Sequence, residues 1–201
     1  MQKLPASLQH LVEQLADLPG IGPKSALRMA MTLLKWPEDK ARSLGSSIYQ
    51  LRDKLCICSC CAALADTDPC SICGDPMREK DKLCIVSEWD SLLVVEESGF
   101  FQGRYLVLGG LLSPLDGVRA DSLELDKLRG RLGSEPISEI ILALGTTLEA
   151  ENTSSYIKNV VEKEFPEVRV TRLAQGIPLG SDLKFMDKET LKQSMRYRQN
   201  L

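Results

Sequence analysis

The chain has one histidine, few aromatic residues and no large excess of either charge. Its net charge of −3 excludes a molecule that is basic all over, so any nucleic-acid binding must come from a local patch. No apolar run reaches the roughly 18 residues that a membrane span needs. The opening residues, MQKLPASLQH, lack the apolar core of a secretory signal. We therefore expect a cytoplasmic protein without membrane contact, whose 201 residues form one large or two small domains.

Several catalytic motifs are also missing. The chain contains no phosphate-cradling G-x-x-x-x-G-K-[ST] loop, which argues against an ATPase. Its single histidine, His10, falls in an N-terminal helical stretch and is most simply a surface residue. A serine–histidine–aspartate set is therefore not supported, and neither is nucleophilic hydrolysis.

Cysteine is concentrated in one short segment, where four residues follow the spacing C-x2-C-x8-C-x2-C: Cys58, Cys61, Cys70 and Cys73. Two such knuckles are typical of a tetrahedral structural zinc site, because each points two thiolates at one ion. Four protein ligands leave no position for water, so one Zn²⁺ per chain should stabilise the fold rather than catalyse. Two disulfides or unrelated thiols are the alternative, which a reducing compartment disfavours.

A neighbouring cysteine complicates the choice of ligands. Cys60 offers other pairs, but Cys58 with Cys61 reproduces the two-residue spacer of the second knuckle. We expect Cys56 and Cys60 to pack or stay free, and Cys84 lies outside the motif.

The N-terminal part has helical periodicity interrupted by a tight turn. Leucines recur at helical spacing over 6–18, and a second helix is predicted at 23–35 with a proline in its first turn. No helix can continue through the intervening segment PGIGP. A third amphipathic helix is predicted from Pro37.

This hairpin contains a candidate phosphate site. Its two glycines leave the backbone bare, and the second helix begins with unpaired N–H groups and a positive dipole end. Two cations lie one turn apart on that helix, a third lies near the same face, and residues 21–37 contain no Asp or Glu. The pattern predicts a sequence-independent grip on DNA, with a plain packing unit bearing a solvated basic face as the alternative. The residues are Gly20, Gly22, Lys24, Arg28 and Lys35.

From residue 83 onward, short β-rich runs alternate with helical stretches. This alternation predicts a parallel α/β sheet. The expected strands are 83–86, 105–108, 139–144 and 168–173, and the expected helices are 88–98, 122–132, 150–164 and, in the tail, 188–198.

Five segments in this order resemble the bacterial recombination mediator family RecR. They are LPGIGPKSALRMA at 18–30, the cysteine motif at 58–73, LSPLDGV at 112–118, EIILAL…LEAENT at 139–153 and RLAQGIPLGSDL at 172–183. The resemblance implies a small cytoplasmic protein that forms a ring, a tetramer in this family. It also implies binding to single- and double-stranded DNA and action with RecO and RecF. Together they load RecA onto single-stranded DNA coated by single-strand-binding protein.

The resemblance also implies an α+β protein in four parts. A helix-hairpin-helix module for DNA binding and oligomerisation would occupy 1–55, and a four-cysteine zinc finger 56–76. A Toprim-like domain with a parallel sheet would occupy 80–174, and a C-terminal helical arm 175–201.

Toprim enzymes need a glutamate after the first strand and an Asp-x-Asp pair after a later one, which together hold Mg²⁺. Here Ser87 occupies the glutamate position, and Glu88 comes one residue late. A shift of one residue on a strand turns the side chain to the other face, unless Glu88 lies beyond the strand end, and the sequence leaves both alternatives open. The segment 145–147 reads Gly-Thr-Thr where the aspartate pair would stand. We therefore predict a non-catalytic protein. The alternative is a Mg²⁺-dependent nuclease or primase-like enzyme with a degraded motif.

Three acidic residues remain as candidate partner contacts: Asp116, Glu149 and Glu151. The LSPLDGV loop around Asp116 is either a partner-binding loop, as the resemblance implies, or a rigid crossover. The glutamate pair could attract a divalent ion weakly, or form a solvated acidic turn at a helix N-terminus. Gln175 departs from the family, whose members usually carry histidine there. A zinc-stapled interaction module without DNA contact is a third hypothesis, which the acid-free stretch disfavours.

Overall fold

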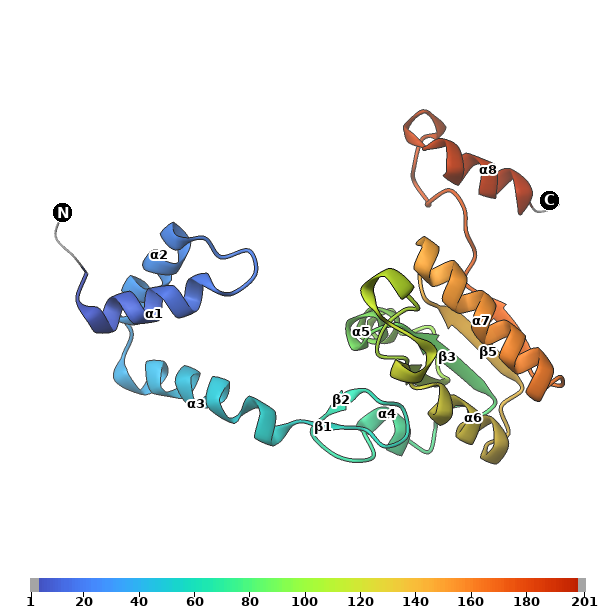
Figure 1. Ribbon diagram of the computed structural model, residues 1–201, viewed down its shortest axis with the longest axis horizontal. Helices are drawn as coiled ribbons and strands as arrows, with labels where there is room; N and C mark the ends of the chain where they lie inside the picture. The colour runs from blue at the N-terminus through green and yellow to red at the C-terminus, as the bar shows by residue number, and fades with distance from the viewer. Residues whose placement is uncertain (1–3, 199–201) are drawn as a thin grey trace. The chain divides into compact units, whose positions relative to one another are not determined.

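A computed structural model describes residues 4–198 of the chain, so the last three residues of the expected arm lie outside it (Figure 1). The chain divides into two compact units, Met1–Leu55 and Cys56–Leu201. Each unit is built around its own set of elements.

The first unit consists of three helices, α1 (Ala6–Ala16), α2 (Pro23–Leu33) and α3 (Glu38–Lys54). Helices α1 and α2 pack against each other as the expected hairpin. Both end two residues earlier than the sequence predicts, because the chain tightens there into i→i+3 hydrogen bonds, such as that from Lys35 N to Thr32 O at 3.0 Å. Pro37 is the N-cap of α3 and not its first residue, because its ψ of 143° is extended.

Little of the apolar surface of this unit is buried. Among its described residues, Ala26 and Ala30 alone are buried. The leucine-rich face of α1 contains no fully buried residue, and Ile48 and Leu51 on α3 are 68% and 57% exposed. The predicted amphipathic faces are therefore present but incompletely covered within one chain.

The second unit contains a four-stranded parallel sheet in the order β4-β3-β5-β6, as the strand–helix alternation predicted. Each observed strand or helix overlaps its predicted range and differs from it by one to three residues at its ends. The strands are β3 (Lys82–Val86), β4 (Arg104–Val107), β5 (Glu139–Ala143) and β6 (Arg169–Arg172), and the helices are α5 (Trp89–Glu97), α6 (Leu125–Ser134) and α7 (Leu148–Glu164).

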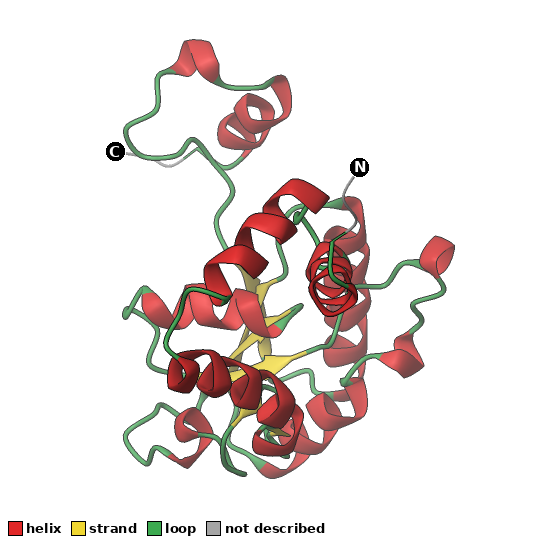
Figure 2. Ribbon diagram, turned by 90° about the vertical axis from the view of Figure 1, so that its left-hand side faces the viewer, coloured by secondary structure: helices red, strands yellow, loops and turns green. Residues whose placement is uncertain are grey.

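The sheet lies between helices (Figure 2). Alternate side chains of β3 point to its opposite faces. Leu83 and Ile85 join a buried cluster with apolar residues of α6 and α7. Cys84 and Val86 join a second cluster that contains Leu92 of α5 and three residues of the cysteine motif. The cysteine segment therefore helps to cover one face of the sheet.

That segment has regular structure which the sequence pattern did not predict. β1 (Cys56–Ile57) and β2 (Leu64–Ala65) pair as an antiparallel hairpin, and α4 (Ser71–Gly74) is a single helical turn. Strands of two residues are too short to show periodicity, which is why pattern reasoning misses them.

The C-terminal segment contains the short η3 (Leu183–Phe185) and the helix α8 (Lys188–Arg196). Asp187 caps α8 and accepts hydrogen bonds from the N–H groups of Glu189 and Thr190 at 3.0 and 2.9 Å. The helix ends two residues before the predicted position. Across residues 4–198, no helix is both long and apolar enough to cross a membrane.

Candidate metal centre and nucleic-acid interface

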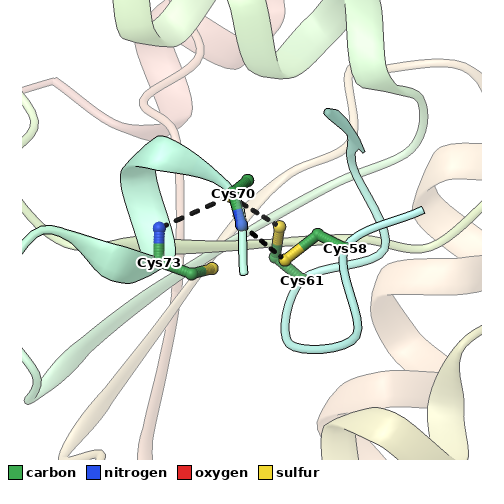
Figure 3. A group of neighbouring side chains, drawn as sticks. All are labelled: Cys58, Cys61, Cys70 and Cys73. Atoms are coloured by element: carbon green, nitrogen blue, oxygen red, sulfur yellow. Dashed lines mark hydrogen bonds between the residues drawn. The ribbon is translucent and has the colours of Figure 1, made fainter. Parts of the chain in front are cut away.

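The four cysteines of the predicted metal site converge (Figure 3). The sulfur atoms of Cys58, Cys61, Cys70 and Cys73 all lie within 4.8 Å of one another. The sulfurs of Cys61 and Cys70 are 3.6 Å apart, whereas a disulfide would bring them to about 2.05 Å. Tetrahedral zinc with bonds of about 2.3 Å would place sulfurs about 3.8 Å apart. The arrangement fits a single metal ion, and the four cysteines form no disulfide with one another.

Backbone N–H groups donate hydrogen bonds to two of the cysteine sulfurs, which favours their thiolate forms. The N–H of Cys70 donates to the sulfur of Cys58, and that of Cys73 to the sulfur of Cys70, each at 3.4 Å. A hydrogen bond from the Cys73 thiol lowers the pKa of Cys61 to about 5. Burial raises the pKa of Cys70 to about 11. The pKa of Cys73 is also raised, first by its hydrogen bond to Cys61 and then by burial, so an ion that binds Cys70 and Cys73 as thiolates must displace their protons.

The three remaining cysteines lie outside this cluster. Cys60 is exposed, so the alternative ligand pairs that its position allows are not formed. Cys56 lies 3.3 Å from the carbonyl oxygen of Ala65. Cys84 is buried in the sheet, where desolvation raises its pKa to about 12.

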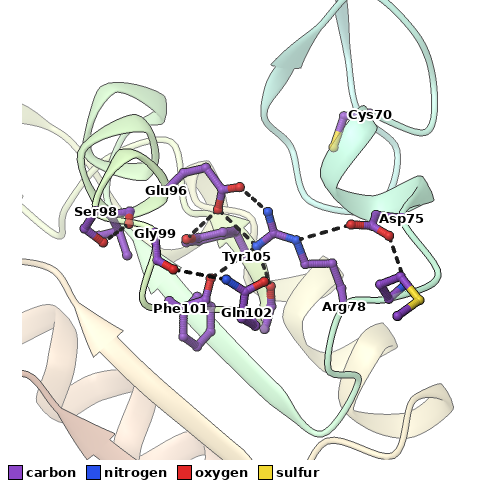
Figure 4. Close-up of polar contacts among 12 residues, drawn as sticks. Cys70, Asp75, Arg78, Glu96, Ser98, Gly99, Phe101, Gln102 and Tyr105 are labelled. Carbon is purple, nitrogen blue, oxygen red and sulfur yellow. Dashed lines mark hydrogen bonds and ion pairs between the residues drawn. The ribbon is translucent and has the colours of Figure 1, made fainter.

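An arginine ties the segment after the cysteines to α5 and to the loop that leads into β4 (Figure 4). Arg78 forms a bidentate ion pair with Glu96 of α5 and donates to the carbonyl oxygens of Phe101 and Gly103 at 3.3 and 3.4 Å. The hydroxyl of Tyr105 donates to the same Glu96 carboxylate at 3.0 Å. Sequence reasoning missed this arginine because its partners lie 18 to 25 residues away.

The two glycines in the turn of the helical hairpin have different structural roles. Gly20 has a φ of +78°, a left-handed conformation that is strained for a residue with a side chain. Gly22 is the N-cap of α2 with extended backbone, and a Cβ there would meet nothing within 4 Å. No side chain caps α2, so its first N–H groups are left for water or a ligand. The space around Gly22 leaves the backbone open to a phosphate.

The cations predicted for this site are all exposed. Lys24 and Arg28 stand on α2, and Lys35 follows its end. Thr32 lies between Arg28 and Lys35 in the sequence, and its hydroxyl donates to the carbonyl oxygen of Arg28 at 2.9 Å. These side chains are free to reach a phosphate backbone.

At the carboxyl ends of the strands, no group of three potential metal-binding acids is found among the described residues. Glu88 lies beyond the end of β3 and is exposed. Thr147 caps α7 and accepts from the N–H of Ala150 at 3.2 Å, a role that accounts for a short polar residue there. Position 147, where a Toprim enzyme would have a metal-binding aspartate, therefore has a helix-capping threonine in this chain.

The second acid of the glutamate pair is already engaged. Both carboxylate oxygens of Glu151 accept from Nη1 of Arg172, at 2.9 and 2.8 Å, and Gln175 donates to one of them at 3.1 Å. Arg172 also donates to the hydroxyl of Tyr197, after α8, at 2.8 Å. The pair therefore links the sheet to the arm, an arrangement that opposes metal binding by Glu151. Nothing in the sequence pattern pointed to Arg172.

The LSPLDGV loop is internally braced. Ser113 and Val118 form an isolated antiparallel bridge, and the Ser113 hydroxyl donates to Asp116 at 2.6 Å. The N–H of Leu112 donates to the hydroxyl of Thr153 on α7 at 2.8 Å. Leu115 at the tip is 100% exposed, an apolar side chain at the surface that sequence reasoning did not single out.

Three family models match the chain in the order of these parts. A model described as RecR, helix-hairpin-helix, matches residues 8–51. A Toprim domain model matches 81–174, and a model described as RecR, C-terminal, matches 176–199. Together with the cysteine cluster, they define a Toprim protein with a helix-hairpin-helix module and a four-cysteine site capable of binding a metal.

Relatives cover the whole length. The chain is 62% identical over 201 residues, all of both proteins, to "Recombination protein RecR" of Nitratidesulfovibrio vulgaris. It is 59% identical over the same full span to the protein of that name from Maridesulfovibrio salexigens. Identity to that of Desulfatibacillum aliphaticivorans is 43% over 97% of both chains. The chain belongs to the RecR family. The predicted resemblance is confirmed, and the alternative of a Toprim nuclease or primase is not favoured.

Proposed function

We propose that this protein is a cytoplasmic, non-catalytic DNA-binding mediator of recombinational repair. It helps RecO- and RecF-type partners load a RecA-type recombinase onto single-stranded DNA coated by single-strand-binding protein. The observation that carries the proposal is 62% identity over the full chain to a protein named Recombination protein RecR. The match of residues 8–51 to a helix-hairpin-helix model supports DNA binding.

The DNA contact is assigned to the hairpin turn and α2. Gly20 and Gly22 let a phosphate approach the uncapped start of the helix, and Lys24, Arg28 and Lys35 supply the charge. Contacts of this kind recognise the backbone and not the bases, so binding is independent of sequence and weakens as salt rises. Few cations per chain imply that several chains act together on one DNA.

The metal of the cysteine cluster is proposed to be zinc, one ion per chain. Cys58, Cys61, Cys70 and Cys73 would hold it. Four thiolates suit zinc and complete its coordination, so its contribution is to stability.

The absence of catalysis is proposed from the carboxylates. Ser87 and Thr147 stand where phosphoryl chemistry needs acids, and Glu151 is committed to Arg172. We assign Asp116, Glu149 and Glu151 to partner docking instead. Leu115 beside Asp116 supports this, because its fully exposed side chain on a braced loop is available to be buried against a partner.

Self-assembly is proposed to produce a ring, a tetramer as the family resemblance implies. The exposed apolar faces of the helical unit and the exposed arm residues Leu179 and Phe185 support such contacts. In this scheme residues 1–55 bind DNA and a neighbouring chain, 56–76 hold zinc, 80–174 form the Toprim-like domain and 175–201 the arm.

The test is the double variant Lys24→Glu/Arg28→Glu, with Lys82→Glu as a control outside the hairpin. The double variant should weaken binding to all DNA sequences alike and lower the salt dependence, by about one unit of log–log slope per lost contact. Fluorescence polarisation with labelled single and double strands measures both. Unchanged affinity in a folded double variant would refute the assignment.

A further inference from the structure

Trp36 occupies the junction between α2 and α3, outside any buried core. The backbone N–H of Trp36 donates to the carbonyl oxygen of Leu33 at 3.1 Å, and the next residue, Pro37, is the N-cap of α3. The side chain is half-buried. Neither buried apolar cluster of the described residues contains it, and the buried side chains of its own unit are Ala26 and Ala30. An indole placed in this way keeps surface available for a ligand.

One lysine lies over this indole and another precedes it in the sequence. The ammonium nitrogen of Lys40 lies 4.0 Å from the centroid of the Trp36 ring, a cation–π distance. Lys35 immediately precedes it. Two acids open α3, and Glu38 is paired with Arg42 at 2.5 Å. The ring is thus an aromatic surface at the end of the acid-free stretch 21–37.

We propose that Trp36 is a stacking platform for an unpaired base of single-stranded DNA, flanked by Lys35 and Lys40. The proposal rests on the proposed function, since it needs DNA along α2. The nine residues from Lys24 to Leu33, at about 1.5 Å each, span about 14 Å of α2, and Trp36 lies three residues beyond the end of that helix. A helical length of about 14 Å corresponds to about four nucleotides at the spacing of a duplex strand. One strand gripped at the start of α2 can therefore reach the ring.

Stacking would give the hairpin a preference that phosphate contacts cannot give. Phosphates are present in single and double strands alike, whereas base faces are free only in a single strand. An aromatic platform of this kind accepts any base, so sequence independence is kept. Trp36 would then favour single strands without choosing among sequences.

The two tryptophans of the chain, Trp36 and Trp89, allow a direct readout. In a Trp89→Phe background, fluorescence comes from Trp36 alone. A 15-nucleotide oligo(dT) should quench this emission on binding, and a duplex of the same length should not. Absence of quenching by the single strand, under conditions where polarisation shows it bound, would overturn the proposal.

Affinities supply the second arm. Trp36→Leu should weaken single-strand binding at least about fivefold and change duplex binding less than about twofold, while Trp36→Phe retains most single-strand affinity. Equal losses on both DNAs would mean that Trp36 merely holds the α2–α3 junction, and no loss would also refute stacking. Circular dichroism checks folding. Lys24→Glu/Arg28→Glu separates the two ideas: if it has no effect on either DNA, the proposed function itself fails.

Discussion

The backbone N–H of Val107 in β4 donates a hydrogen bond of 2.8 Å to the carbonyl oxygen of Cys61 in the cysteine cluster. β4 is one of the two edge strands of the sheet, so this bond occupies part of an edge that could otherwise pair with another chain. Val107 and Tyr105 also share a buried cluster with Cys61. The cysteine cluster is therefore part of the core on one face of the sheet.

Purified protein is expected to contain one zinc ion per chain, and Cys70→Ser should be zinc-poor or insoluble. Losing a thiolate removes metal-derived folding energy, and the edge at β4 should loosen with it. Metal analysis and hydrogen exchange of residues 104–107 measure the two effects. Cys60→Ser, an exposed cysteine outside the cluster, is the control and should keep its zinc. Soluble wild type without zinc, or full retention in Cys70→Ser, would contradict the expectation.

The stability contribution of Glu135 should depend on pH. Its carboxylate accepts from the buried Arg131 at 2.8 and 3.0 Å and from Arg104 at 3.3 Å. Burial opposes the charge, but the Arg131 hydrogen bonds and both cations outweigh it, so the pKa of Glu135 is lowered. A lowered pKa in the folded state means that the stabilisation exists above the ordinary pKa. It is lost as pH falls through the folded value.

Glu135→Gln should therefore lower the free energy of unfolding by about 2–4 kcal/mol at neutral pH, because Arg131 loses its counter-charge. The difference from wild type should shrink toward about pH 3. Urea unfolding at both pH values measures it. Glu79→Gln, which removes an exposed pair with Lys82, should cost less than about 1 kcal/mol. A difference as large in acid as at neutral pH would argue against the charge pair as the cause.

Arg172→Gln should release the arm. This arginine joins Glu151 to Tyr197, and the variant loses both contacts. Hydrogen exchange over residues 187–197 should accelerate while strands β3 and β5 stay protected. Arg169→Gln on the same strand, whose partner is Glu139, is the matched control. Unchanged exchange in α8 would show that other contacts hold the arm.

Nuclease and topoisomerase activity should be absent even with Mg²⁺. The chain lacks acids at 87, 145 and 147, and phosphoryl transfer requires carboxylates around the ion. Incubation with plasmid and oligonucleotide tests this, with Glu149→Gln alongside. Metal-dependent cleavage that disappears in this variant would overturn the non-catalytic proposal.

Light scattering should find an oligomer for the full chain and a smaller species for a chain truncated before Lys188. The truncation removes α8, whose Met195 is 67% exposed and available to a neighbour. If the truncated chain no longer assembles, its ability to promote recombinase loading should fall as well. A wild type that is monomeric at micromolar concentration yet still promotes loading with its partner would exclude the ring requirement.

Local patterns were enough to predict the helical hairpin, the four-cysteine cluster and the parallel α/β sheet. Each depends on spacing within a short segment: leucines at helical intervals, two C-x2-C knuckles, and apolar runs bounded by glycine. The ends of the elements were missed by a few residues, because capping by Thr147 or Pro37 depends on backbone geometry that composition does not encode.

The sequence by itself thus determined which elements form and which cysteines share a metal-binding geometry. Only the tertiary structure decided that the cysteine cluster covers a face of the sheet, that Arg78 pairs with Glu96, and that Arg172 pairs with Glu151. These contacts join residues that the crossover connections between parallel strands and the packing of helices on the sheet bring together. Burial and charge pairing at such distances along the chain are properties of the folded molecule, so no local spacing could reveal them.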